Sequence, residues 1–120
     1  MPADKISGIL GLCRRAGRLV LGFDITAEVI AKKTACLVLL AKDASPRTTR
    51  EITKTAQEAG LPVRTLPLTM DEISYAVAKR AGVLAVCDSG FANKINRLLC
   101  EGANAVQAHR ETARIQEGNA

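Results

Sequence analysis

The chain has 120 residues, of which 48% are hydrophobic, enough for one globular domain that needs no disulfide or metal support. Seventeen Lys and Arg outnumber twelve Asp and Glu, and the resulting net charge of +5 favours encounters with polyanions such as nucleic acids. No apolar run approaches the roughly 18 residues of a membrane span, and the first residues lack a secretory signal pattern. We therefore expect a cytoplasmic protein without a membrane partner.

The N-terminal part of the chain predicts a helix and then a short strand. The helix covers residues 4–16, and Gly17 is placed to end it in a left-handed conformation. One face of this helix carries the apolar residues Ile6, Ile9, Leu10 and Cys13. The strand covers residues 19–21, and Gly22 ends it.

The next segment predicts a second helix and a strand that is buried on both faces. The helix covers residues 24–33 and is expected to bury Ile25, Val29 and Ile30. The apolar run of residues 36–41 shows no alternation, which is typical of a strand covered by helices on both faces of a parallel sheet. Lys42 and Asp43 follow it directly. Because ligands of open α/β sheets bind outside the carboxyl ends of strands, we expect function at this corner.

Capping residues mark two further helices. Ser45 and Pro46 fit the N-cap and first position of a helix over residues 46–59 that Gly60 ends. Its core-facing residues are expected to be Ile52, Ala56 and Ala59. After a third strand at residues 63–66, Thr69 and Glu72 form a capping-box pattern. The helix that they start is expected to pack Ile73, Ala76 and Val77.

The C-terminal part predicts a fourth strand, at residues 83–87, and a last amphipathic helix. Because apolar density falls after residue 100, residues 1–100 are expected to form a single domain and residues 101–120 a polar tail. The regular alternation of helices and strands predicts a three-layer α/β/α sandwich. Its central four-stranded sheet is expected to be mostly parallel, with any antiparallel strand at an edge.

Little in the sequence indicates catalysis, a cofactor or a metal. Neither a P-loop nor a dinucleotide-binding glycine pattern is present. Asp24, Asp43 and Asp88 each follow a predicted strand, but each also fits a helix cap or a turn. The four cysteines lack short paired spacing, which favours buried, reduced thiols over a zinc site. We therefore expect a binding protein and no enzyme.

The aromatic content limits the kind of nucleic acid. The chain has two Phe, one Tyr and no Trp, too few for the base-stacking platforms of single-strand binders. A nucleic-acid partner would therefore be structured RNA, recognised through its phosphates by helix N-termini and basic side chains. No specificity for DNA is expected.

Four segments in register, within residues 5–99, carry a family resemblance: Leu12–Val20, Gly22, Leu37–Ser45 and Gly90–Ile95. Together they resemble the ribosomal-protein superfamily that binds kink-turn RNA, and within it the small bacterial YlxQ-like members. The resemblance implies the α/β/α sandwich, non-enzymatic binding of ribosomal or kink-turn-like RNA, and association with the ribosome.

The resemblance also implies a site made by the start of the second helix, the end of the second strand and the loop after the fourth helix. The expected RNA-binding residues are Arg18, Gly22, Phe23, Asp24, Ile25, Glu28, Lys32, Lys42, Asp43, Lys79, Arg80, Ala81 and Gly82. Family members typically present an amide or carboxylate and then a Lys where this chain has Asp24, Ile25 and Glu28. Ile25 cannot hydrogen-bond a base, and Glu28 brings a negative charge toward a phosphate.

Two alternatives stay open. The first is a protein-interaction module on the same fold, in which kink-turn recognition has been lost. Exposed apolar residues near Ile25, or a homodimer, would favour it. The second is a small-ligand or metal enzyme, which requires a deep pocket around Asp43 and Asp88.

Overall fold

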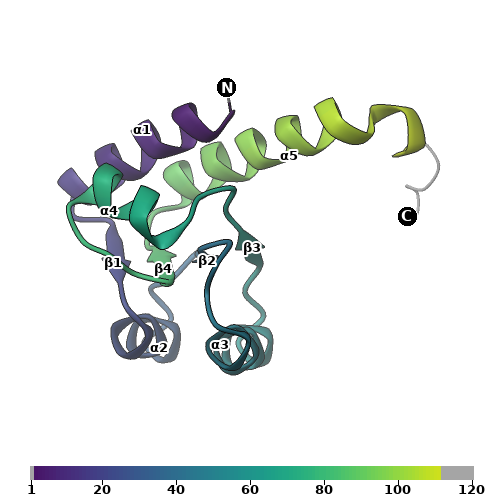
Figure 1. Ribbon diagram of the computed structural model, residues 1–120. Coiled ribbons are helices and arrows are strands. Elements are labelled where there is room, and N and C mark those ends of the chain that lie inside the picture. Colours follow the sequence, from purple (N-terminus) through teal and green to yellow (C-terminus); the bar gives the residue numbers. More distant parts are fainter. Residues whose placement is uncertain (1, 112–120) are drawn as a thin grey trace.

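The computed structural model describes the backbone of residues 2–111 and the side chains of residues 4–100. Helices and strands alternate along the described chain (Figure 1). The helices are α1 (Pro2–Arg15), α2 (Phe23–Ala31), α3 (Pro46–Glu58), α4 (Met70–Val77) and α5 (Ser89–Glu111). The strands are β1 (Leu19–Leu21), β2 (Leu37–Leu40), β3 (Val63–Thr65) and β4 (Val83–Val86).

The four strands form one sheet in the order β1-β4-β2-β3. β2 and β3 are parallel, while β4 runs antiparallel to both of its neighbours, β1 and β2. Three of the four strands of this sheet therefore share one direction, as expected for a mostly parallel sheet. The expected position of the reversed strand was wrong, because β4 lies inside the sheet rather than at an edge.

Helices cover both faces of the sheet and confirm the three layers (Figure 1). α1, α4 and α5 enclose one core with the sheet, which includes Ile6, Leu39, Ile73 and Ile95. α2 and α3 enclose the other core, which includes Ile30, Val38, Ile52 and Ala85. β2 and β4 are buried along their whole length because they lie between the two helical layers.

Local signals start and end the helices as expected. The Ser45 side chain accepts a hydrogen bond from the Thr48 N–H, and Pro46 is the first residue of α3. Thr69 and Glu72 form both bonds of the capping box that starts α4. After α1, Gly17 adopts a φ of 74° and closes the helix.

The expected inner face of α2 was partly wrong. Ile25 is 42% exposed, whereas Thr26 is fully buried and Ile30 is 3% exposed. The helix begins at Phe23, with Gly22 as its N-cap, and its inner face is rotated from the one that the apolar residues suggested. The C-cap of α3, Ala59, is likewise exposed, because the helix ends before it can face the core.

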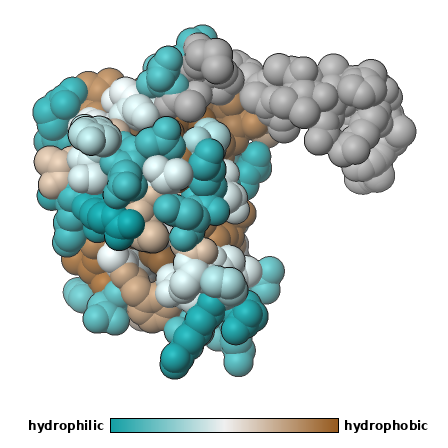
Figure 2. All heavy atoms as spheres, viewed as in Figure 1, coloured by the Kyte–Doolittle hydropathy of each residue, from teal (hydrophilic) through white to brown (hydrophobic). Residues whose placement is uncertain are grey.

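The last helix runs past the expected domain boundary at residue 100, since α5 extends to Glu111. The remainder of the predicted tail, residues 112–120, lies outside the described residues. In Figure 2, hydrophilic side chains cover much of the face turned to the viewer, and apolar surface shows near the top, in the layer of α1 and α5. None of the helices in the described part is long and apolar enough to span a membrane.

Candidate nucleic-acid interface

The starts of three helices converge at one end of the sheet. The N–H of Gly22, before α2, donates to the carbonyl of Val83 over 2.8 Å. The Ala41 N–H donates to the Gly82 carbonyl over 2.9 Å, and the Lys42 N–H donates to the Leu68 carbonyl over 2.8 Å. These bonds bring the first residues of α2, α3 and α4 together with the loop before β4. We call this end of the molecule the three-helix corner and define it by residues 22–25, 42–46, 69–70 and 79–82.

A small hollow of about 270 Å³ lies in the three-helix corner. It is lined by Phe23, Ala44, Ser45, Thr48, Met70, Gly82 and Val83. A Cβ atom on Gly82 would stand 3.3 Å from the Met70 sulfur and 3.5 Å from the Ala44 Cβ. The absence of a side chain at Gly82 therefore lets α3, α4 and β4 approach one another around the hollow.

The helix starts at this corner differ in how their free N–H groups are satisfied. The first turn of α3 is capped by Ser45, and the first turn of α4 is capped by Thr69. In addition, the Asp43 Oδ1 accepts a hydrogen bond from the Met70 N–H over 2.9 Å. Gly22 starts α2 without any side-chain cap, at a φ of 122° that favours glycine.

The N–H groups of Phe23, Asp24 and Ile25, the first three residues of α2, consequently find no acceptor among the described residues. Unpaired N–H groups and the positive end of the helix dipole attract anions, and phosphate is a common ligand there. Asp24, in the same turn, is exposed and acidic. A phosphate at this helix start would therefore meet the negative charge of Asp24 in the same turn.

The side-chain charges at the corner are mixed rather than strongly basic. Lys42 and Lys79 are exposed. Arg80 forms an ion pair with Asp71, with 2.9 Å between its Nε and the carboxylate Oδ1. Asp24 and Asp43 add negative charge to the same corner. A phosphate would therefore be attracted here by the uncapped start of α2 more than by an excess of cations.

Two of the expected RNA-binding cations lie at the other end of the sheet. The Arg18 carbonyl accepts a bond from the Cys87 N–H where β1 begins and β4 has ended. Lys32 is the C-cap of α2, whose nine residues span about 13 Å. The expected surface is therefore divided, with most of its residues at the three-helix corner and these two away from it.

Glu28 lies one turn into α2 and pairs with Lys32 over 2.7 Å. The hydrogen bond and charge of Lys32 lower the pKa of the Glu28 carboxyl below its usual value. Both side chains are exposed, so the pair adds little to stability. It does reduce the positive charge that Lys32 presents to a phosphate.

Three further expected residues differ in their environments. Ala81 is only 7% exposed and packs in the core with α1, α4 and α5, so it supports the loop rather than facing a ligand. Ile25 is exposed beside Gly22 and gives the corner an aliphatic contact surface. Phe23 is half-buried against the core on the α2 and α3 side.

The aspartates considered as a metal cluster are separated. Asp43 follows β2 at the three-helix corner, whereas Asp88 follows the reversed strand β4 and lies at the opposite end. Asp88 accepts a hydrogen bond from the Phe91 N–H over 2.9 Å at the start of α5. Within the described residues, no three His, Cys, Asp or Glu side chains are grouped as metal ligands would be.

The four cysteines are free thiols, but not all are buried as expected. Cys13 is buried, Cys36 and Cys87 are half-buried, and Cys100 is exposed. Cys100 lies on α5 within reach of β3, since the Arg64 side chain is 3.7 Å from its sulfur.

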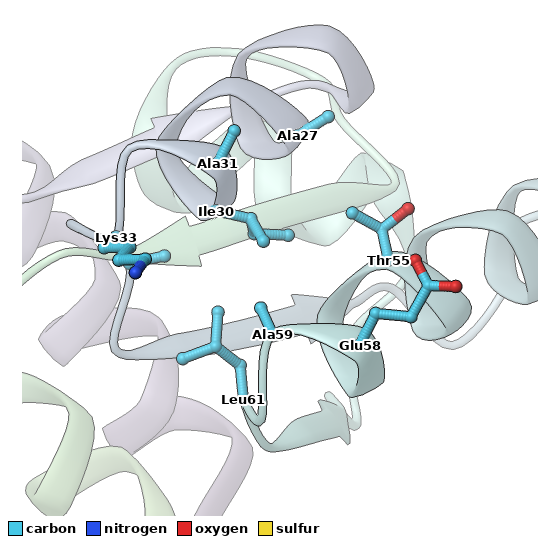
Figure 3. A pocket seen from close by; sticks show the side chains of 9 residues that line it. Ala27, Ile30, Ala31, Lys33, Thr55, Glu58, Ala59 and Leu61 are labelled. Atoms are coloured by element: carbon cyan, nitrogen blue, oxygen red, sulfur yellow. The ribbon is translucent and has the colours of Figure 1, made fainter.

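A second hollow, of about 660 Å³, lies between α2 and α3 (Figure 3). Its lining is mostly small and aliphatic, with Lys33 and Glu58 as its charged residues. None of the expected RNA-binding residues lines it. The sequence analysis missed this hollow, and the signal for it was the alanine-rich pattern of α2, which leaves space against α3.

The comparisons with known proteins agree with this architecture. The model of the ribosomal protein L7Ae/L30e/S12e/Gadd45 family matches residues 4–96. The chain belongs to this family. It is 36% identical over 92 residues to the "RNA-binding protein YlxQ" of Bacillus subtilis, covering 76% of this chain and 91% of that protein. It is 30% identical over 96 residues to the protein of the same name from Enterococcus faecium, covering 80% of this chain and 92% of that protein.

Solved structures show the same L7Ae-family fold. A Bacillus halodurans protein, described as of unknown function, has a TM-score of 0.74 and 26% identity, covering 78% of this chain and 95% of that one. The Giardia lamblia 15.5kD RNA binding protein has a TM-score of 0.68 and 13% identity, covering 83% of this chain and 86% of that one. The second likeness concerns the fold alone. Both the family and the YlxQ-like resemblance expected from the sequence are thereby confirmed.

Proposed function

We propose that this L7Ae-family chain is a non-enzymatic cytoplasmic protein that binds structured RNA, kink-turn-like or ribosomal, at the three-helix corner. The observation that carries the proposal is the uncapped start of α2, beside the hollow between α3 and α4. The two YlxQ relatives are both named as RNA-binding proteins, which supports the same partner. Association with the ribosome follows if the partner is ribosomal RNA.

In this proposal, an RNA phosphate sits at the free N–H groups of α2. Gly22 has no side chain, so the RNA backbone can come within hydrogen-bond distance of these groups. Lys42 and Lys79 are exposed nearby and contact phosphates on either side. Lys32 and Arg18 contribute only long-range attraction, because they lie at the other end of the sheet.

The narrower claim, kink-turn-like recognition, rests on the hollow. Its volume of about 270 Å³ suits one base that leaves the RNA stack, and its lining of small and flexible side chains packs on that base. Ile25 makes an aliphatic contact where a hydrogen-bonding side chain would read a base edge. Recognition in this proposal therefore depends on RNA shape more than on base sequence.

The test compares two double variants that remove the same charge. Lys42→Gln with Lys79→Gln changes the three-helix corner, whereas Lys33→Gln with Lys54→Gln changes exposed positions outside it. For a kink-turn RNA, the first pair is expected to weaken binding about tenfold. It should also reduce the slope of the logarithm of the binding constant against the logarithm of the salt concentration by about 1 to 2. Equal effects of the two pairs would contradict binding at the corner.

A second candidate, a protein-interaction module, is favoured by the 42% exposure of Ile25. The two candidates respond differently to Ile25→Asn, which replaces an aliphatic contact with a hydrogen-bonding side chain. Kink-turn RNA binding is expected to strengthen, because an amide can read a base edge. A protein contact that depends on Ile25 would weaken instead, as a pull-down without RNA would show.

A further inference from the structure

α1 and α5 leave a groove between them, of about 470 Å³. Its floor is aliphatic and is formed by Gly8, Ile9, Leu12 and Leu98. Leu12 is 48% exposed there, which is unusual for a leucine on a helix that is packed against another helix. Figure 1 shows the two helices side by side over the same face of the sheet.

The described residues give no packing reason for Gly8. A Cβ atom at Gly8 would meet none of them within 4 Å, and its φ lies outside the range that requires glycine. Gly11, one turn further on, differs because its Cβ would stand 3.2 Å from the Ala76 carbonyl oxygen of α4. Glycine destabilises a helix interior relative to alanine. Gly8 therefore costs stability without a packing benefit among the described residues, which leave the groove floor open.

The charges that the described residues bring to the groove have one sign. Its charged lining residues are Lys5 and Arg15 of α1 and Lys94 of α5, all exposed, and no acidic side chain among residues 4–100 lines it. Lys5 and Arg15 are ten residues apart on the helix, so the groove runs for about 15 Å, or three helical turns.

We infer that this groove docks an acidic amphipathic helix of a protein partner. Apolar side chains of the partner, spaced i, i+4 and i+7, cover Leu12 and enter the space above Gly8. Acidic residues flanking them pair with Lys5, Arg15 and Lys94. Such a helix matches the groove in charge, because the rim is basic, and in shape, because the floor is aliphatic and about three helical turns long.

Two other occupants fit less well. RNA would find phosphate contacts at the rim, but no aromatic side chain among the described residues lines the groove for base stacking. A second copy joined by two-fold symmetry would place these cations opposite the same cations. The groove shares none of its described lining residues with the hollow of the three-helix corner. The chain can therefore bind RNA and the partner helix at the same time.

The test begins with photo-crosslinking in the cell, using the full chain with a benzoylphenylalanine in place of Leu12. The control places the same group at Tyr75, which is 90% exposed on α4 and outside the groove. Mass spectrometry identifies the crosslinked segment, which is then synthesised as a peptide and titrated into the purified chain. We expect position 12, and not position 75, to crosslink to a segment with acidic residues around helically spaced apolar ones.

Variants then test the groove itself. Gly8→Leu fills the floor of the groove, and the double variant Lys5→Glu with Lys94→Glu reverses the charge at its rim. Each of these two proteins is expected to bind the peptide at least tenfold more weakly. Gly8→Leu should leave kink-turn RNA affinity unchanged, and its melting curve shows whether it is folded. Gly8→Ala should melt about 4 °C higher than the natural chain, because no packing opposes it.

Three results would overturn the inference. They are crosslinks from position 12 to RNA only, crosslinks to another copy of this chain, and the absence of any product specific to position 12. Peptide binding that is insensitive to both groove variants would do the same. The inference does not depend on the proposed RNA function, and loss of kink-turn binding in the natural chain would leave the peptide result unaffected.

Discussion

The carboxylate of Asp43 accepts a hydrogen bond from the backbone N–H of Met70 over 2.9 Å, and so joins the end of β2 to the start of α4. The two residues are 27 positions apart in the chain. This contact fixes the segment before α3 against the start of α4, and both line the hollow at the three-helix corner. Asp43 was expected from the family resemblance to contact RNA, and the structure gives it a positioning contact within the protein.

Removing this contact should loosen α4. Asp43→Ala is expected to lower the free energy of unfolding by about 1 kcal/mol, since a first-turn N–H loses its acceptor. Asp43→Asn keeps an acceptor oxygen at the same place and should lower the free energy of unfolding by less than Asp43→Ala does. Urea unfolding of the three proteins measures the difference. If both variants unfold alike, the hydrogen bond has no such role.

Gly22 should be sensitive to substitution for stability and for RNA binding at once. At a φ of 122° and a ψ of 157°, any side chain is strained, so Gly22→Ala should cost about 1–3 kcal/mol of unfolding free energy. The added methyl group should also weaken RNA binding by keeping the backbone away from α2. Titrations at a temperature where the variant is folded separate the two effects.

Gly60→Ala is the matched control for that experiment. Gly60 also has a positive φ, of 74°, but lies after α3 and outside the three-helix corner. Its substitution should lower stability without changing RNA affinity. Equal losses of affinity in both variants would mean that strain alone, and not the approach of RNA, explains the effect.

Ala78 offers a stabilising substitution. It ends α4 in the left-handed conformation, with a φ of 63°, at a cost that glycine does not bear. Ala78→Gly is therefore expected to raise the free energy of unfolding by about 1 kcal/mol, as measured by urea unfolding. Ala59→Gly, at the exposed end of α3 with a negative φ, should give no gain. A loss of stability in Ala78→Gly would contradict the assigned backbone conformation.

The cysteines should react in the order of their exposure. Burial, with the charges of Asp88 and Cys87, raises the pKa of the Cys13 thiol to about 11, and burial also raises that of Cys87. Alkylation of the folded protein at pH 8 should therefore modify Cys100 first and Cys13 last. Mass spectrometry after timed quenching gives the order, and early modification of Cys13 would contradict its burial.

The same shift predicts a pH dependence of stability. An unfolded Cys13 thiol loses its proton near its ordinary pKa of 9.0, whereas the folded thiol keeps its proton to about 11. The unfolded state thus binds fewer protons between these values, so this residue lowers stability as pH rises from about 9 to about 11. Cys13→Ala should unfold with a smaller decline over that range, in urea titrations at each pH.

Signals that lie within a few residues of each other were predicted correctly. The N-cap of α3 and the capping box of α4 are examples, because Ser45 and Thr69 bond to groups three positions away. The left-handed backbone conformations that follow α2 at Lys33 and end α4 at Ala78 were not predicted, because neither residue is glycine. The buried face of α2 was partly missed because Thr26, a polar residue, is fully buried there.

The candidate site depended on longer-range relationships. The reversal of β4 inside the sheet brings the loop at Lys79–Gly82 to the starts of α2 and α3, and it moves Asp88 to the opposite end. The direction of a strand depends on how the chain crosses the sheet, which no local pattern in β4 records. The family resemblance supplied most of the corner residues, but it did not separate Arg18 and Lys32 from them.

Titration of the purified chain into a kink-turn RNA and into a plain duplex of the same length, at two salt concentrations, tests the central claim most directly. The proposal predicts tighter binding to the kink-turn at both salts, with affinity for each RNA falling as salt rises. Equal affinity for the two RNAs would contradict recognition of RNA shape by the three-helix corner. The absence of binding to either RNA would contradict the proposed function itself.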